Sequence, residues 1–333
     1  NAGIEVIAGE NSDVEMDADI DVTETGSDAI IDPITIGDVN LVAETSAEAD
    51  VEISIEADAN TAGNATIGDT TIGDVDLTAG TDASVTFTLE QSASASSGNA
   101  IVGDLLIGDV DMIITGSGGE IDLSISRDAA ASTGDATIGN TTVGNIDIVL
   151  ADDADTATFD VSVTASVDTG TATVGNLLIG DISVDAGESS DVTIEVFQYA
   201  TADTSGDAIA GDITLGSIDA TLGDFADMSV SISQTVIADS GNATAGNWTI
   251  GDITVDLGED ATFDVDLSSE ATADSGFLST IGDVTVGNLM LTQASGADVS
   301  IDISVDADAS GDGSGVVGNV MLGDVTSVMG LSS

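Results

Sequence analysis

The chain is built from one sequence unit that returns nine times. The stretch GNATIGDTTIGDVDL begins at Gly63, and related stretches begin at intervals of 35 to 37 residues from Gly26 to Gly313. A period this constant is typical of repeat architectures, in which each unit buries its apolar side against its neighbours. The repeat therefore constrains the fold of the 333-residue chain more than any other feature does.

Each unit contains two Gly-Asp or Gly-Asn pairs, five residues apart, as at Gly68-Asp69 and Gly73-Asp74. The first copy alone departs from the earlier pair, with Asp32-Pro33. Glycine permits backbone angles that other residues resist, and Asp and Asn cap turns through their short side chains. We therefore expect two tight corners per repeat, with the apolar residue before each corner, such as Ile67 or Ile72, pointing inward.

Before these corners, each unit carries a stretch in which apolar and polar residues alternate. In the second repeat Val51, Ile53 and Ile55 alternate with acidic residues and Ser. An alternation of period two indicates a half-buried strand, and no apolar stripe of helical period is sustained anywhere. The pattern predicts an all-β fold, a β-solenoid of about nine coils of 35–37 residues. Each coil has one long strand plus short strands joined by Gly-Asp or Gly-Asn corners.

The whole chain, residues 1–333, is predicted to be a single repeat solenoid without a linker or a separate terminal domain. Residues 1–10 resemble the end of a repeat, so the chain starts partway round a coil. The expected repeats are 11–46, 47–81, 82–117, 118–153, 154–189, 190–224, 225–259, 260–295 and 296–333.

The charge is extreme: 62 acidic residues and one basic residue give a formal net charge of −61. Hydrophobic residues make up 42% of the chain, which is too many for a disordered acidic tail, so we expect a folded body with its acids outside. Without a positive patch, neither nucleic acid nor an anionic membrane surface is a direct partner. No apolar run approaches the ~20 residues of a membrane-spanning helix, so membrane insertion is not expected either.

An acidic surface of this strength requires a solvent rich in cations or a low pH. The sequence starts at Asn1 rather than Met, which indicates that a leader was removed, and the absence of Cys is compatible with export. We expect an extracellular or cell-surface protein, secreted after leader removal. Four N-x-T sequons could carry glycans at exposed corners or could reflect chance in a chain rich in Asn and Thr: Asn64, Asn140, Asn242 and Asn247.

Catalysis is not expected. The chain has neither His nor Cys, so carboxylates and hydroxyls are the groups left for acid–base or nucleophilic work. Two carboxylates could hydrolyse a glycoside. However, the carboxylates recur at structural positions, and no repeat carries a constellation that the others lack. We therefore expect no enzymatic activity and no organic cofactor.

The acidic corners favour calcium. Stacked coils place equivalent residues ~4.8 Å apart. At that distance two carboxylates repel each other by roughly 3 kcal/mol at an effective dielectric near 20, and by about 1 kcal/mol in water. Calcium, which takes several oxygen ligands, would turn this repulsion into attraction. The alternative is turn chemistry alone, with Asn residues forming amide ladders without metal. The candidate ligands are Asp69, Asp74, Asp104, Asp109, Asp181, Asp212, Asp252, Asp283 and Asp324.

One inward-facing row contains polar residues. Arg127, Gln91 and Gln234 share the same offset before the glycine of their own repeat. Such residues could form a stacked polar layer inside the coil, where they would satisfy one another. They could instead mark a strand end from which the side chains reach solvent. The second interpretation is preferred here.

The leading functional hypothesis is a non-enzymatic extracellular structural protein, the subunit of a head-to-tail filament or matrix fibre. A solenoid exposes unpaired strand edges at both ends, and no polar capping helix is seen at either end of the sequence. The expected partners are therefore further copies of the chain, joined through residues 1–25 and about 299–333, and cations. The alternative is a monomeric, calcium-stabilised β-solenoid stalk or adhesin segment.

Overall fold

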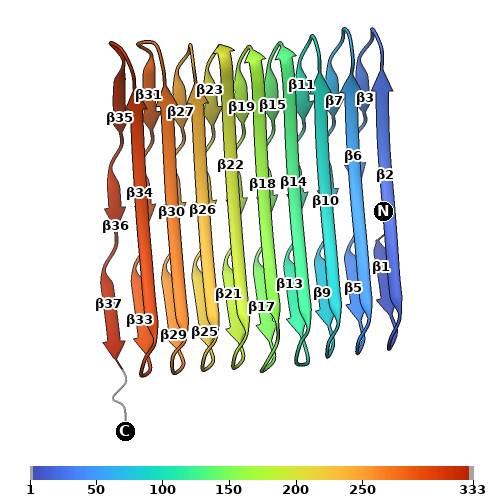
Figure 1. Cartoon of the computed structure of the whole chain (residues 1–333), viewed down its shortest axis with the longest axis vertical. Coiled ribbons are helices and arrows are strands. Elements are labelled where there is room, and N and C mark those ends of the chain that lie inside the picture. Colours follow the sequence, from blue (N-terminus) through green and yellow to red (C-terminus); the bar gives the residue numbers. More distant parts are fainter. Residues whose placement is uncertain (1–2, 330–333) are drawn as a thin grey trace.

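The computed structural model describes residues 3–329, so the Asn1 start and residues 330–333 of the last predicted repeat lie outside the described residues. Within that range the chain forms 37 β-strands and no helix. The strands wind as stacked coils into four parallel sheets (Figure 1). The prediction of an all-β solenoid is confirmed.

Every full coil contributes one long strand and three short strands. The long strands pair in the order of the sequence into what we call the long sheet, which Figure 1 shows across the width of the molecule. Its strands are β2 (Asp13–Glu24), β6 (Glu48–Ala59), β10 (Ser84–Ala95), β14 (Glu120–Thr133), β18 (Thr156–Thr169), β22 (Asp191–Ser205), β26 (Asp227–Ala238), β30 (Thr262–Ala273) and β34 (Asp298–Ala309).

The three short strands of each coil form the opposite layer, as the first, second and third short sheets. The first contains β3 (Ala29–Ile31), β7 (Ala65–Ile67), β11 (Ala100–Val102), β15 (Ala136–Ile138), β19 (Ala172–Val174), β23 (Ala208–Ala210), β27 (Ala243–Ala245), β31 (Leu278–Ile281) and β35 (Ser314–Val317). The second contains β4 (Ile34–Thr35), β8 (Thr70–Ile72), β12 (Leu105–Ile107), β16 (Thr141–Val143), β20 (Leu177–Ile179), β24 (Ile213–Leu215), β28 (Trp248–Ile250), β32 (Val284–Val286) and β36 (Val320–Leu322).

The third short sheet returns the chain to the long sheet and holds ten strands. These are β1 (Ile4–Ala8), β5 (Val39–Ala43), β9 (Val75–Ala79), β13 (Val110–Ile114), β17 (Ile146–Leu150), β21 (Ile182–Ala186), β25 (Ile218–Leu222), β29 (Ile253–Leu257), β33 (Leu289–Gln293) and β37 (Val325–Met329). Because β1 pairs with β5 in this sheet, the first described strand is the end of a coil, as its sequence indicates.

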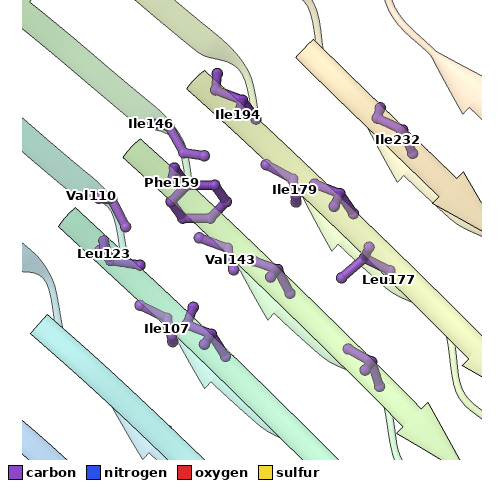
Figure 2. Packing of buried hydrophobic residues seen from close by; sticks show 14 of the residues in the cluster. Ile107, Val110, Leu123, Val143, Ile146, Phe159, Leu177, Ile179, Ile194 and Ile232 are labelled. Carbon is purple, nitrogen blue, oxygen red and sulfur yellow. The ribbon is translucent and has the colours of Figure 1, made fainter. Parts of the chain in front are cut away.

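The core lies between the long sheet and the three short sheets, and it is arranged in rows that run from coil to coil. Leu123, Phe159 and Ile194 form one such row on the long sheet. Figure 2 shows this row and a second one on the second short sheet, which contains Ile107, Val143 and Ile179. Ile67 and Ile72, before the two corners, are buried as expected. A one-residue slip of any strand would turn its acidic face inward, so the register is strongly specified.

The preferred interpretation of the polar row is wrong. Arg127, Gln91 and Gln234 do not reach solvent: the exposed fractions of these side chains are 1%, 2% and 0%. Arg127 donates from Nε to Gln91 Oε1 (2.8 Å) and from a terminal nitrogen to Thr141 Oγ1 (2.6 Å). Its other hydrogen bonds go to the backbone carbonyls of Gly103, Gly139 and Asn140.

The same row forms a second buried network further along. Gln198 donates to the carbonyl of Gly175 (2.6 Å), and Gln234 donates to that of Gly211 (2.8 Å) and to Gln198. Trp248 Nε1 donates to Gln234 Oε1 (3.0 Å). These carbonyls belong to the corner between the first and second short sheets, where the chain bends. The polar row lies opposite this corner and satisfies backbone groups that would otherwise be buried without a partner.

Candidate cation corners and assembly faces

The first corner, between the first and second short sheets, is lined by a ladder of Asp and Asn side chains. Asp69 Oδ1 accepts the backbone N–H of Asp104 in the next coil (3.0 Å), and Asp104 Oδ1 accepts that of Asn140 (2.7 Å). The same bond continues from coil to coil as far as Asn319. Each carboxylate or amide thus fastens its own coil to the following one.

The second corner, between the second and third short sheets, carries an equivalent ladder. Asp38 Oδ1 accepts the N–H of Asp74 (3.3 Å), and Asp74 Oδ1 accepts that of Asp109 (3.1 Å). The ladder continues to Ser217, whose side chain has no carbonyl oxygen to offer the next coil. It resumes at Asp252 and reaches Asp324.

The reason expected for the corner glycines is wrong. Backbone angles in the left-handed region occur at the turn after the long strand, for example at Gly63 and Gly98, and not at Gly103 or Gly180. At these corners the preceding coil lies where a Cβ atom would be, with its backbone and, at many corners, with the oxygen of its Asp or Asn side chain. A Cβ on Gly103 would lie 2.7 Å from Asp69 Oδ1, and one on Gly180 would lie 2.5 Å from the corresponding Asn145 oxygen. The glycines therefore make room for the ladders.

The structure brings four of the nine candidate ligands together as two pairs. Asp69 and Asp104 are neighbours in the first ladder, and Asp74 and Asp109 are neighbours in the second. Since Oδ1 of Asp69 and Asp74 is used within the ladder, Oδ2 is the oxygen that remains for a cation. All nine side chains are exposed except that of Asp212, which is partly buried.

The other five candidates have Asn or Ser as ladder neighbours. Where Asn follows Asp, its side-chain amide also donates to the carboxylate, as Asn247 does to Asp212 (3.1 Å) and Asn319 to Asp283 (3.0 Å). These are the amide ladders of the alternative interpretation. The five residues are Asp181, Asp212, Asp252, Asp283 and Asp324.

The sequence reasoning missed a row of acids beside the second corner. Asp76, Asp111 and Asp147 are in register on the third short sheet, two residues after their corners. Burial raises the pKa of Asp111 above its ordinary value, and the charges of Asp76 and Asp147 raise it further. The sequence pattern that reveals this row is a second Asp two residues after the corner residue, as in the stretches GDVD, GDVD and GNID. Among residues 3–329, however, no group of three or more acidic side chains has the geometry to hold one metal ion.

A third ladder, also missed, runs along the turn between the long sheet and the first short sheet. Asp28 Oδ1 accepts the N–H of Asn64 (2.7 Å), and Asn64 Oδ1 accepts that of Asn99 (2.9 Å). The sequon residues Asn64, Asn140 and Asn247 are exposed and Asn242 is partly buried; all four use Oδ1 as a ladder acceptor.

The two end coils of the described chain leave the core open. On β2 the inward side chains of Met16 and Ile20 are 37% and 38% exposed, whereas their counterparts one coil further in are at most 1% exposed. At the other end, Val320 and Leu322 of β36 are 50% and 48% exposed. We call these surfaces the N-terminal face, made by β1 to β4, and the C-terminal face, made by β34 to β37.

Comparisons with known proteins identify no family for this chain. No protein-family description, curated protein or solved structure matches the chain. None of the described residues belongs to a helix of the length and apolarity needed to cross a membrane.

Proposed function

We propose that this chain is a non-enzymatic extracellular structural protein, the subunit of a filament or matrix fibre that grows by head-to-tail stacking of solenoids. One observation carries the proposal: within residues 3–329, both end faces combine strand edges that pair with no other described strand and exposed apolar side chains of core type. Monomeric solenoids need polar caps at such places. Covering these faces would remove apolar surface from water, which favours association.

A second copy of the chain is the occupant that fits. Continuing the register of the long sheet pairs β34 with β2 of the next copy, and both strands have 12 residues. In the third short sheet, β37 meets β1, and both have five residues. The inward row then continues from Ile301 to Met16 and from Val305 to Ile20.

Such a contact joins two different faces, so it does not close on itself and generates an open filament. The parallel pairing at the joint would repeat the pairing between coils of one chain. The net charge of −61 supports a cation-rich, extracellular setting and keeps neighbouring filaments apart. No organic cofactor is needed for this role.

Electron microscopy and sedimentation of the purified chain test the proposal. We expect unbranched filaments, and we expect them to shorten or disappear when residues 1–10 are deleted. A point variant avoids the deletion: Ile303→Lys places a charge inside the joint, whereas Ser304→Lys, its neighbour on the outer face of β34, leaves the interior unchanged. Filaments from Ser304→Lys but not from Ile303→Lys are the expected result. A full-length protein that stays monomeric at high concentration with calcium present, at acidic as well as neutral pH, contradicts the filament.

The second candidate function is a monomeric stalk or adhesin segment stabilised by calcium. The observation that favours it is the pairing of Asp69 with Asp104 and of Asp74 with Asp109 along the corners. Calcium bound between such pairs would stiffen single solenoids without requiring assembly. Isolated rods, in place of fibres, would be seen in the same micrographs.

A further inference from the structure

The outer face of the long sheet carries its acids mainly at the two ends of the solenoid. Outward positions of β2 hold Asp13, Glu15, Asp17, Asp19 and Asp21, and those of β34 hold Asp298, Asp302, Asp306 and Asp308. In the middle, the outward face of β10 has one acid, Glu90, that of β18 has two, Asp160 and Asp168, and that of β14 has three, Glu120, Asp122 and Asp128. Ser and Thr fill most of the remaining central positions.

We propose that the head-to-tail joint is pH-dependent: the carboxylates on β34 and β2 keep subunits apart at neutral pH, and their protonation allows the joint to close. This inference rests on the proposed function, because it concerns the same two faces. It adds the condition under which the faces associate.

The register of the long sheet shows what the joint brings together. Asp17 pairs with Glu52, and at the other end of the same row Asp266 pairs with Asp302. Continuing this register into a second copy places Asp302 next to Asp17. The joint therefore creates an unbroken row of four acids: Asp266, Asp302, Asp17 and Glu52.

Two more rows behave in the same way. The row through Asp21 becomes Glu270, Asp306, Asp21 and Glu56. The row through Asp13 becomes Asp298, Asp13 and Glu48. Neighbouring carboxylates in such rows are ~4.8 Å apart, a distance at which two negative charges repel each other.

Inside one chain most rows of this kind are interrupted. Thr88 and Ser124 follow Glu52 in the first row, and Ser92 follows Glu56 in the second. The acid pairs between β2 and β6 form in spite of their mutual repulsion, because both strands belong to one polypeptide and the rest of the coil holds them together. Even there, burial raises the pKa of Glu52, and Glu90, Asp17, Asp19 and Asp50 raise it further. Between two separate subunits, only the association itself can offset the repulsion.

No basic side chain of the described end faces balances these rows. The one basic side chain of the sequence, that of Arg127, is buried within the body on β14. Charged side chains on edge strands are a known means of preventing edge-to-edge pairing. Once the acids are neutral, the apolar side chains of Ile301, Ile303 and Met16 favour closure, because they are partly or largely uncovered in the free subunit.

The test compares assembly at pH 7.5 and pH 4.5, in low salt with a chelator present, by sedimentation and electron microscopy. For the unmodified chain we expect a critical concentration higher at pH 7.5 by about tenfold or more. The joint variant carries Asp17→Asn, Asp21→Asn, Asp302→Asn and Asp306→Asn, and it should form filaments at both pH values. The matched control carries the same change of charge in the central strands, as Asp122→Asn, Asp128→Asn, Asp160→Asn and Glu195→Gln, and should behave like the unmodified chain.

The Ile303→Lys variant distinguishes ordered assembly at pH 4.5 from isoelectric precipitation, because this variant should give no ordered filaments at that pH. If the unmodified chain assembles equally well at both pH values, or if the control variant matches the joint variant, the pH-dependent joint is overturned while the filament function stands. If neither the unmodified chain nor the joint variant forms filaments at either pH, the proposed function is overturned and the joint with it.

Discussion

At the scale of single residues, the return turn between the third short sheet and the long sheet repeatedly requires a left-handed backbone. Asn11, Ser46 and Asp82 adopt it with φ of 55°, 54° and 50°. Phe225 occupies the same position with φ of 60° and is 52% exposed. Asn and Asp tolerate this conformation because their short side chains form local hydrogen bonds, whereas Phe has no such compensation.

Phe225→Asn should therefore stabilise the fold. We expect the free energy of unfolding to rise by about 1 kcal/mol, because the left-handed conformation costs roughly 1–2 kcal/mol for an unsuited residue. Urea denaturation followed by circular dichroism measures the change. Asp260→Asn, at the equivalent turn with φ of 56°, is the matched control and should have little effect. An equal gain in both variants would point to charge or composition and contradict the backbone argument.

The buried Arg127 is the second residue whose role is set by its surroundings. Arg127→Leu should lower the free energy of unfolding by about 3–5 kcal/mol, because it leaves the carbonyls of Gly103 and Gly139 buried without a partner. Burial lowers the pKa of Arg127 to about 10, so the side chain is still charged at neutral pH.

Arg127→Gln provides the comparison, since Gln198 and Gln234 satisfy the equivalent carbonyls in later coils. It should lose clearly less stability than Arg127→Leu in the same urea titration. Equal losses would show that packing volume, and not the hydrogen bonds, makes the residue important.

At the scale of elements, the side chains of the corner ladders have two roles, as acceptors of backbone hydrogen bonds and as charged groups, and the sequence does not separate them. Each Asp or Asn accepts a backbone N–H from the next coil, and this role does not need a charge. Paired carboxylates add repulsion that a cation could relieve, whereas carboxylates flanked by Asn do not. The two roles can be separated by replacing Asp with Asn, because Asn keeps the side-chain oxygen that accepts the hydrogen bond and removes the charge.

Millimolar calcium should raise the melting temperature more than sodium chloride of equal ionic strength, by about 2 °C or more. The paired variant, with Asn at positions 69, 74, 104 and 109, should lose this difference. The matched variant, with Asn at 181, 212, 252 and 283, should keep it. Identical melting curves in calcium and in sodium chloride for the unmodified chain would leave charge screening as the whole effect.

At the scale of the whole molecule, the crowding of acids should make the folded state less stable at neutral pH than at acidic pH. Burial raises the pKa of Asp122, Asp128 and Asp160 above the ordinary value, and the charge of Glu195 adds to the effect at Asp160. Burial also raises the pKa of Asp111 and Asp191, again with contributions from neighbouring acids. An acid whose pKa is higher in the folded state binds its proton more tightly when folded.

Stability should therefore increase as pH falls from 7 towards 4. The contribution of these groups is complete below the unfolded pKa, near 4, and is lost as pH rises through the higher folded values. Because the side chains are partly solvated, we expect a gain on the order of 1–3 kcal/mol in total. Urea midpoints of the Ile303→Lys variant, which is designed to block the proposed assembly, measure this gain without interference from filaments. A midpoint that falls steadily between pH 7 and pH 4.5 would contradict this sign.

The β-solenoid could be predicted from the amino-acid sequence alone. A period of 35 to 37 residues, alternation before each corner and Gly-Asx pairs within it are all local features, and each repeat states them again. Stacked units contact only their neighbours, so each strand pairs with the equivalent strand of the adjacent repeat. The direction in which Ile67 and Ile72 point also followed from this local pattern.

Which residues are neighbours along the stack depends on the register between coils, and the structure was needed to show that register. The ladders join residues one coil apart, so they became visible once the register of neighbouring coils was known. The same register showed that Asp69 meets Asp104 whereas Asp283 meets Asn247 and Asn319. It also showed that corner glycines make room for the backbone and side chains of the preceding coil. The side chain of Arg127 is buried because it donates hydrogen bonds to backbone carbonyls at a corner of the opposite layer. The alternation of apolar and polar residues within one strand cannot predict which groups the opposite layer presents to it.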